Sequence, residues 1–199
     1  MTHEQILSEI KRLRYLFDIK RVMRYNSTRD HSVHSESVAE HVYGVLILAK
    51  YFLPLEDPEQ KMDWKKIFDI ILFHDVVEIE TGDTLFHKKN PDHSQREDVA
   101  IEKVKENVPE SMQNAIRELF LDYKNKKSPE AQFAFAVDKL EPLLELFDEV
   151  NIKSYKRLKV TKEVSRKPKD VAVKDYPVMK KFLDVWMEYF ASKDAFYKE

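Results

Sequence analysis

The apolar residues of this chain recur mainly at intervals of three and four positions. That spacing is typical of amphipathic α-helices, and there is almost no sustained alternation of apolar and polar residues such as a β-strand shows. The pattern therefore predicts an all-α protein, a helical bundle. The predicted helices span about 3–18, 35–53, 63–80, 94–107, 111–123, 129–152 and 176–193, and the predicted loops are 26–35, 82–92 and the basic stretch 159–174.

The chain is long enough for one domain with a substantial core, because 43% of its 199 residues are hydrophobic and 12% are aromatic. No internal repeat or low-complexity tract marks a second domain. We therefore expect residues 1–199 to form a single domain.

Composition also excludes several kinds of site. The 34 basic and 36 acidic residues nearly cancel to a formal charge of -2, without a block of like charge, which favours a small bound anion over a long nucleic acid. The absence of cysteine excludes disulfides, thiolate metal sites and a cysteine nucleophile. With only Gly44 and Gly82, neither a P-loop nor a dinucleotide-binding glycine motif can be present. Any metal must bind nitrogen and oxygen ligands.

The sequence carries no sign of a membrane or export segment. The first residues lack a basic region followed by an apolar run, and no apolar stretch approaches the roughly 20 residues of a membrane span. A soluble, cytoplasmic protein is expected.

Two histidines and two aspartates stand out on the predicted helices. His41 and His74 lie on the apolar stripes of two helices, Asp75 lies beside His74, and Asp138 lies at the edge of the stripe of a third. Taken singly, each has an ordinary explanation, since a lone inward histidine is more often a hydrogen-bonded core residue and an acid at a stripe edge is usually solvated.

Together these four residues favour a metal site. Two imidazoles and two carboxylates converging from three helices are costly to bury unless they neutralise one another or bind a cation. Two nitrogen and two oxygen donors suit manganese, cobalt, magnesium, iron or zinc, and an octahedral ion would keep two positions for water and substrate. Because such an ion polarises a phosphoryl oxygen and lowers the pKa of a coordinated water, the site predicts hydrolysis.

Two nearby residues extend the pattern. Glu78, one turn beyond His74, is placed either to exchange a proton with the water or leaving group or only to orient a ligand, and spacing alone does not decide between these roles. Gly44 lies one turn after His41 inside a helix, where glycine costs about 1 kcal/mol relative to alanine. A close helix approach near the site would explain it, as would ordinary tight packing.

The order of His41, the adjacent pair His74-Asp75 and the distant Asp138 resembles the HD-domain superfamily of metal-dependent phosphohydrolases. The segments 37–41 (SVAEH) and 74–83 (HDVVEIETGD) are similar to those of the bacterial 5'-deoxynucleotidases and their HD-domain-containing relatives. The resemblance covers about residues 5–150 and leaves a helical extension at about 151–199. It implies an HD-type helical bundle, often a homodimer.

The resemblance also implies roles around the metal. His41, His74, Asp75 and Asp138 would hold one divalent cation. Glu78 would assist proton transfer, so that Glu78 and Asp75 are the candidate catalytic residues.

A second set of roles concerns the substrate. Arg24 would bind phosphate through its planar fork of donors, with Arg29 as a second basic residue, and Tyr25 would lie against the sugar, which Asp83 would contact. A solvated surface position is the alternative for Arg24. Tyrosine stands at position 25 where the nucleotidases carry tryptophan, and the segment after Asp83 lacks their proline. The choice between deoxyribose and ribose therefore stays open.

The leading hypothesis from the sequence is hydrolysis of a small phosphate ester, a nucleoside 5'-monophosphate. The alternatives are a phosphodiesterase or nucleoside triphosphohydrolase of the same superfamily, a non-catalytic sensor that binds metal and nucleotide, and a metal-free bundle that binds a partner. The last predicted helix is rich in aromatic residues, which would pack against the core or a second subunit: Phe182, Trp186, Tyr189 and Phe190.

Overall fold

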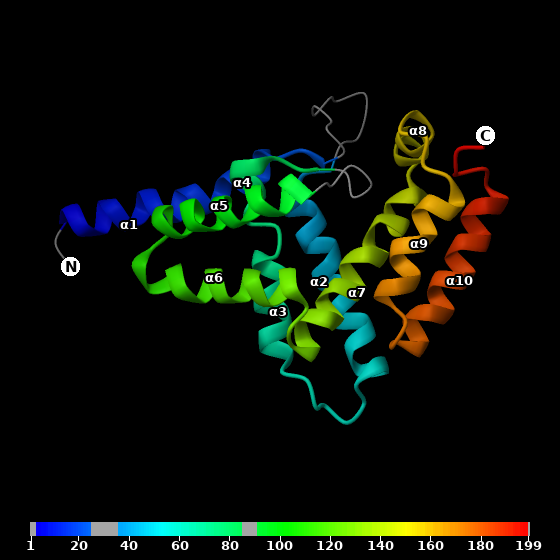
Figure 1. Cartoon of the computed structure of the whole chain (residues 1–199), viewed down its shortest axis with the longest axis horizontal. Coiled ribbons are helices and arrows are strands. Elements are labelled where there is room, and N and C mark those ends of the chain that lie inside the picture. Colours follow the sequence, from blue (N-terminus) through cyan, green and yellow to red (C-terminus); the bar gives the residue numbers. More distant parts are fainter. Residues whose placement is uncertain (1–2, 25–35, 85–90, 199) are drawn as a thin grey trace.

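The computed structural model of the chain describes residues 3–24, 36–84 and 91–198. These residues form helices joined by short turns, with no named strand among them (Figure 1), so the all-α prediction is confirmed. The elements, with η for 3-10 helices, are α1 (His3–Leu16), η1 (Phe17–Arg21), α2 (Val38–Glu56), α3 (Trp64–Phe73), α4 (Glu78–Thr81), α5 (Pro91–Asn107), α6 (Glu110–Asn125), α7 (Pro129–Leu144), η4 (Glu145–Phe147), α8 (Glu149–Arg157), α9 (Lys162–Ala172) and α10 (Pro177–Ser192).

Three of the predicted segments were wrong: two predicted helices are interrupted, and one predicted loop contains a helix. The predicted helix 63–80 is interrupted between α3 and α4, and the predicted helix 129–152 is divided into α7, η4 and α8. The second division occurs where Asp148 accepts a hydrogen bond from the backbone N–H of Val150 and begins a new helix. The predicted loop 159–174 contains α9, whose buried positions are Ser165, Lys169 and Ala172. Because these positions are small or charged, the buried face of α9 carries no large apolar residue to mark it.

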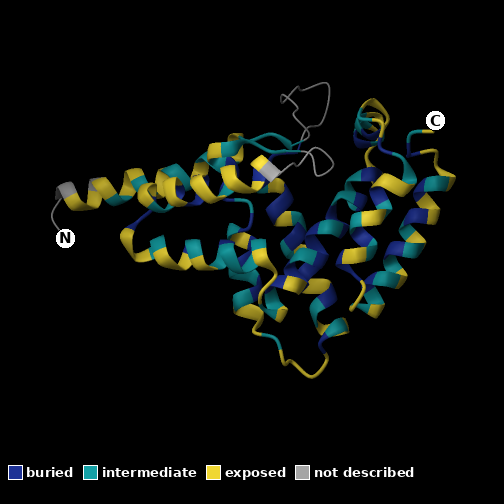
Figure 2. Cartoon of the chain, in the orientation of Figure 1, coloured by how far each residue is buried: buried dark blue, intermediate teal, exposed yellow. Residues whose placement is uncertain are grey.

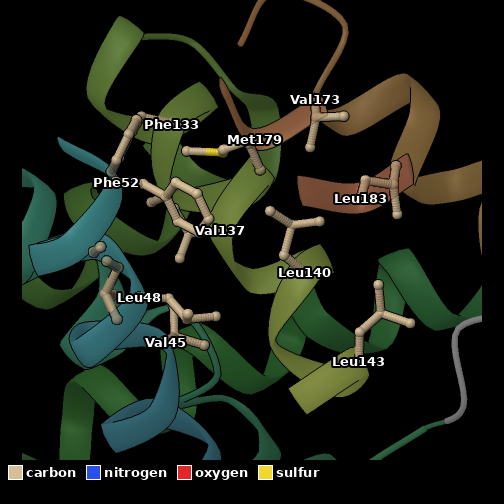
Figure 3. Packing of buried hydrophobic residues seen from close by; sticks show 14 of the residues in the cluster. Val45, Leu48, Phe52, Phe133, Val137, Leu140, Leu143, Val173, Met179 and Leu183 are labelled. Atoms are coloured by element: carbon tan, nitrogen blue, oxygen red, sulfur yellow. The ribbon is translucent and has the colours of Figure 1, made fainter. Parts of the chain in front are cut away.

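The main core lies between α2, α3, α7 and α10. Figure 3 shows side chains of α2 and α7 interleaved with those of α10, including Phe52, Phe133 and Met179, all fully buried. Phe182 packs edge-on against Phe52, with ring centroids 5.1 Å apart, as does Trp186 at 6.4 Å. Core packing of the C-terminal aromatic residues is therefore confirmed for this pair and for Phe190. Tyr189 is 42% exposed and contacts Phe147 at its side.

A second, smaller core joins α5 and α6 to the turn that follows α3. Val76 and Val77 are buried there against Ile101 and Phe120. In Figure 2 the visible faces of α5 and α6 are mainly exposed or intermediate, and the buried residues gather in the centre of the molecule. His74 and Asp75 thus lie in the chain between one element of the main core and one of the smaller core.

One helix differs from what the sequence suggested about membranes. By length and composition, α2 is apolar enough to cross a membrane, whereas we expected no such stretch. This is weak evidence for a span, because a core helix passes the same test. In this structure α2 contacts α3, α7 and α10.

Candidate metal centre

The first turn of α2 places His41. Ser37 caps the helix by accepting a hydrogen bond from the N–H of Glu40, whose carboxylate accepts one from the N–H of Ser37. This reciprocal pair contributes about 1 kcal/mol and determines where the helix begins. His41 follows one residue later and is buried toward α7.

The interruption after α3 places His74 and Asp75 together. The chain leaves α-helical geometry here, with i→i+3 bonds from Val76 N to Phe73 O at 3.2 Å and from Glu78 N to Asp75 O at 2.9 Å. In this turn His74 and Asp75 both border one cavity, with Glu78 at the start of α4 beside them.

The predicted ligand atoms converge. His41 Nε2 lies 3.0 Å from Asp138 Oδ1 and 3.7 Å from Asp75 Oδ2. His74 Nε2 lies 3.2 Å from Asp75 Oδ2 and 3.8 Å from Asp138 Oδ1. A cation with metal–ligand bonds of about 2.1 Å needs donor atoms about 3.0–3.5 Å apart. The structure thus brings together the four residues predicted as ligands, with separations that fit one cation.

Hydrogen bonds on the far side of each imidazole determine which nitrogen faces the cavity. His74 Nδ1 lies 2.7 Å from the carbonyl oxygen of Ile71, and His41 Nδ1 lies 2.7 Å from Glu141 Oε2. Since a carbonyl and a carboxylate only accept, each Nδ1 donates, which leaves each Nε2 for the cavity. His74 Nε2 is buried and has no hydrogen-bond partner in the described part of the chain, although Asp75 lies near it. An unpartnered buried nitrogen beside two carboxylates is suited to a cation.

Asp138 is oriented in the same way. Its Oδ2 accepts hydrogen bonds from the Tyr123 hydroxyl and from Lys139 Nζ, each at 2.5 Å, while Oδ1 faces the imidazoles. Burial alone would raise the pKa of this carboxyl, but Lys139 and the two histidines hold it well below its usual range. Asp138 is therefore an ionised, oriented donor.

The imidazoles hold protons strongly when only protein groups surround them. Burial alone would lower the pKa of both histidines, but nearby carboxylates outweigh it and raise the pKa of His41 to about 9 and that of His74 to about 10. Glu141 and Asp138 act on His41, whereas Asp75 and Asp138 act on His74. Because a metal binds neutral imidazole, a cation entering this site would displace protons from it.

A short stretch of antiparallel backbone pairing places Arg24 at the site. The backbone N–H of Arg24 donates to the carbonyl oxygen of Glu36 at 2.9 Å, next to the bridge between Met23 and Ser37. Its guanidinium pairs with Glu36 at 3.0 Å and Glu141 at 3.2 Å, so Arg24 is the cation of a buried ion-pair cluster behind His41 and not a solvated surface residue. Burial raises the pKa of Glu36 to about 8, opposed by Arg24.

Gly44 makes room for this cluster. A Cβ atom at position 44 would lie 2.7 Å from Glu141 Oε1 and 3.2 Å from its Cγ, which is closer than a methyl group allows. The close helix approach suggested by the sequence is therefore present, between α2 and the side chain that orients His41.

Gly44→Ala is expected to leave the free energy of unfolding within about 1 kcal/mol of the original, because the gain in helix propensity offsets the clash. The displaced Glu141 would release His41, and metal affinity should fall about 10- to 100-fold, as it does when a supporting residue is lost. Thermal unfolding and metal titration measure the two effects. Ala49→Gly, elsewhere in the same helix, should lower stability and spare metal affinity, and equal affinities in Gly44→Ala and the original protein would contradict the assignment.

The donors border a cavity of about 380 Å³, near the small end of the roughly 300–1,000 Å³ range of ligand sites. Glu78 and Asp83 line it with the predicted ligands, and so does Arg24. Gly82, at a φ of 68°, ends α4 and turns the chain toward Asp83. Tyr25 and Arg29, the other predicted substrate residues, lie outside the described residues.

Sequence reasoning missed several residues of the site. Glu141 lies one turn after Asp138, a spacing that could have pointed to it. Tyr123 and Lys139 carried no signal beyond their chemistry. Lys169, in a stretch predicted to be a loop, also lines the cavity.

Comparison with known proteins supports the same family as the motifs. The sequence model described as "HD domain" matches residues 17–179. The 5'-deoxynucleotidase HDDC2 of Bos taurus is 27% identical over 135 residues, which are 67% of this chain and 63% of that protein. The 5'-deoxynucleotidase hdd1 of Schizosaccharomyces pombe is 28% identical over 119 residues, 57% and 58% of the two chains. The match thus spans less than two thirds of these relatives' length.

Solved structures share the fold. A predicted metal-dependent phosphohydrolase from Magnetospirillum magnetotacticum superposes with a TM-score of 0.80 at 21% identity, covering 98% of this chain and 100% of that one. An HD-domain phosphohydrolase from Listeria innocua superposes with a TM-score of 0.59 at 19% identity, covering 90% and 84%. At these identities the likeness shows a common fold.

Proposed function

This chain belongs to the HD-domain phosphohydrolase family, and from that premise we propose that it hydrolyses nucleoside 5'-monophosphates, deoxynucleotides among them, to nucleoside and phosphate. The observation that carries the proposal is the buried His74 Nε2, which lies against ionised carboxylates and has no hydrogen-bond partner among the residues described. Such a donor set is suited to a divalent cation, which can activate water for attack on a phosphate ester.

In this proposal four side chains hold the cation: His41, His74, Asp75 and Asp138. When bound, a divalent ion supplies a Lewis acid for a phosphoryl oxygen and a water nucleophile at neutral pH. The hydrogen bonds from Nδ1 of each histidine keep the ligand geometry rigid, so little reorganisation accompanies the reaction.

The remaining residues act on the substrate. Glu78, buried at the start of α4 and on the cavity wall, accepts a proton from the attacking water or returns one to the leaving oxygen. Asp83 accepts a hydrogen bond from the sugar. By resemblance, Arg24 and Arg29 draw the phosphate in, and Tyr25 lies against the sugar.

Two observations favour a monophosphate among phosphate esters. The curated relatives are named as 5'-deoxynucleotidases. The cavity, at about 380 Å³, suits one nucleotide better than a cyclic dinucleotide. Manganese, cobalt, magnesium, iron and zinc are all compatible with the donor set, and cytoplasmic location and homodimeric assembly stay predictions from the sequence.

The test is a panel of substrates assayed after chelation and addition of each metal in turn. We expect phosphate release from nucleoside 5'-monophosphates, with ribo- and deoxyribonucleotides compared directly. Release from cyclic dinucleotides or of triphosphate from nucleoside triphosphates would assign the diesterase or triphosphohydrolase chemistry instead. No release from any member by protein that holds metal would reject the enzyme and favour a sensor.

A further inference from the structure

A buried lysine of α9 has no carboxylate partner within the part of the chain that the structure describes. The Lys169 side chain is 3% exposed, and its Nζ donates to the carbonyl oxygen of Ser165 at 3.0 Å and to the Ser165 hydroxyl at 3.2 Å. Both acceptors are neutral and belong to the same helix. Among the described residues no carboxylate forms an ion pair with Lys169, and one of its three N–H groups has no acceptor there.

Burying an ammonium group in this way is costly, because transfer from water to the interior requires a compensating charge. Burial, together with the positive charge of Lys139, accordingly lowers the pKa of the Lys169 amine to about 7. A core position of this kind would be more stable with an apolar residue. An anion bound in the cavity would favour the charged form of this amine.

The position of α9 places Lys169 at a cavity in which such an anion could bind. The helix packs against α7, which carries Asp138, and Figure 1 shows the two side by side. Lys169 lines the same cavity as His41, His74 and Asp138. On the same wall, Lys139 pairs with Asp138 and Arg24 pairs with Glu36 and Glu141, whereas Lys126 lies over the ring of Phe135 and is not buried in a helix interface as Lys169 is.

We propose that Lys169 binds the phosphate group of the substrate at the metal centre, its remaining N–H donating to a phosphate oxygen. The proposal rests on the proposed function for the identity of the ligand, a phosphate ester, and adds a substrate-binding residue from the C-terminal part of the chain. It makes α9, predicted to be a loop, a wall of the active site. The phosphate would add a negative charge near Lys169 to that of Asp138, which raises the pKa of the amine.

The experiment compares Lys169→Met with a matched control, Lys167→Met, an exposed lysine on the same helix that does not line the cavity. Each protein is loaded with one equivalent of metal and titrated calorimetrically with inorganic phosphate. We expect the Kd for phosphate to rise about 10-fold or more in Lys169→Met, as for loss of a charged hydrogen bond, and to be unchanged in Lys167→Met. Metal affinity should be equal in all three proteins.

A second measurement on the unchanged protein keeps the proposal testable if Lys169→Met fails to fold. Acetic anhydride labelling at neutral pH, read by mass spectrometry, should show Lys169 protected at least about 5-fold by saturating phosphate, with Lys167 unprotected as the internal reference. Equal phosphate affinity in Lys169→Met, no protection, or no phosphate binding by the unchanged protein would overturn the proposal. Phosphate binding that depends on Lys169 without hydrolysis of any nucleotide would reject the proposed function and keep this inference.

Discussion

His74→Gln is expected to release the metal and to remove activity. The substitution keeps a polar side chain but takes away the buried Nε2 that faces Asp75 and Asp138, the donor with no other hydrogen-bond partner in the described residues. Loss of a residue that only supports a ligand costs about 10- to 100-fold in metal affinity or activity, and loss of the ligand itself should exceed that. Elemental analysis of purified protein and kcat/KM on the best nucleotide measure both.

The matched control is His93→Gln. His93 is also buried, but it pairs with Glu97 on its own helix and does not line the cavity. This variant should keep its metal and its activity, which separates the loss of a ligand from the loss of a buried histidine. Full metal content in His74→Gln would contradict the metal centre and favour the metal-free bundle considered from the sequence.

Glu78→Gln is expected to keep the metal and lose turnover. The amide preserves the size of the side chain and its place at the start of α4 but cannot exchange a proton, so kcat should fall about 100- to 10,000-fold with little change in KM. If Glu78 instead orients a ligand, metal affinity would fall and kcat at saturating metal would recover. Steady-state kinetics over a range of metal concentrations distinguish the two roles.

Glu80→Gln serves as the control for this substitution. Glu80 lies two residues further along α4, accepts a hydrogen bond from the Tyr15 hydroxyl at 2.7 Å and does not line the cavity. Its variant should retain kcat. Comparable kcat in Glu78→Gln and the original protein would contradict a role for Glu78 in proton transfer. Absence of measurable turnover in the original protein would favour the sensor.

The helices that bury apolar stripes were predictable because their signal is local. The start of α2 carries a capping box, Ser37 with Glu40, and its stripe continues through Phe52. The elements that were predicted wrongly lack such a local signal. In α9 the buried face holds Ser165 and Lys169, and the interruption after α3 depends on Val76 and Val77 packing against other helices.

The sequence by itself determined the chemical inventory of this protein: an all-α chain with His41, His74, Asp75 and Asp138 as nitrogen and oxygen donors. Residue identity and helical spacing are local properties, so they can be read along the chain. Only the tertiary structure decided how those donors meet. The turn after α3, in which His74 and Asp75 both border the cavity, is packed against α5 and α6. The pairing of Glu141 with His41, 100 positions apart, and the placement of Lys169 beside them come from the same kind of contact. Such contacts depend on how helices that are distant in the chain pack together, and a short sequence segment does not carry that information.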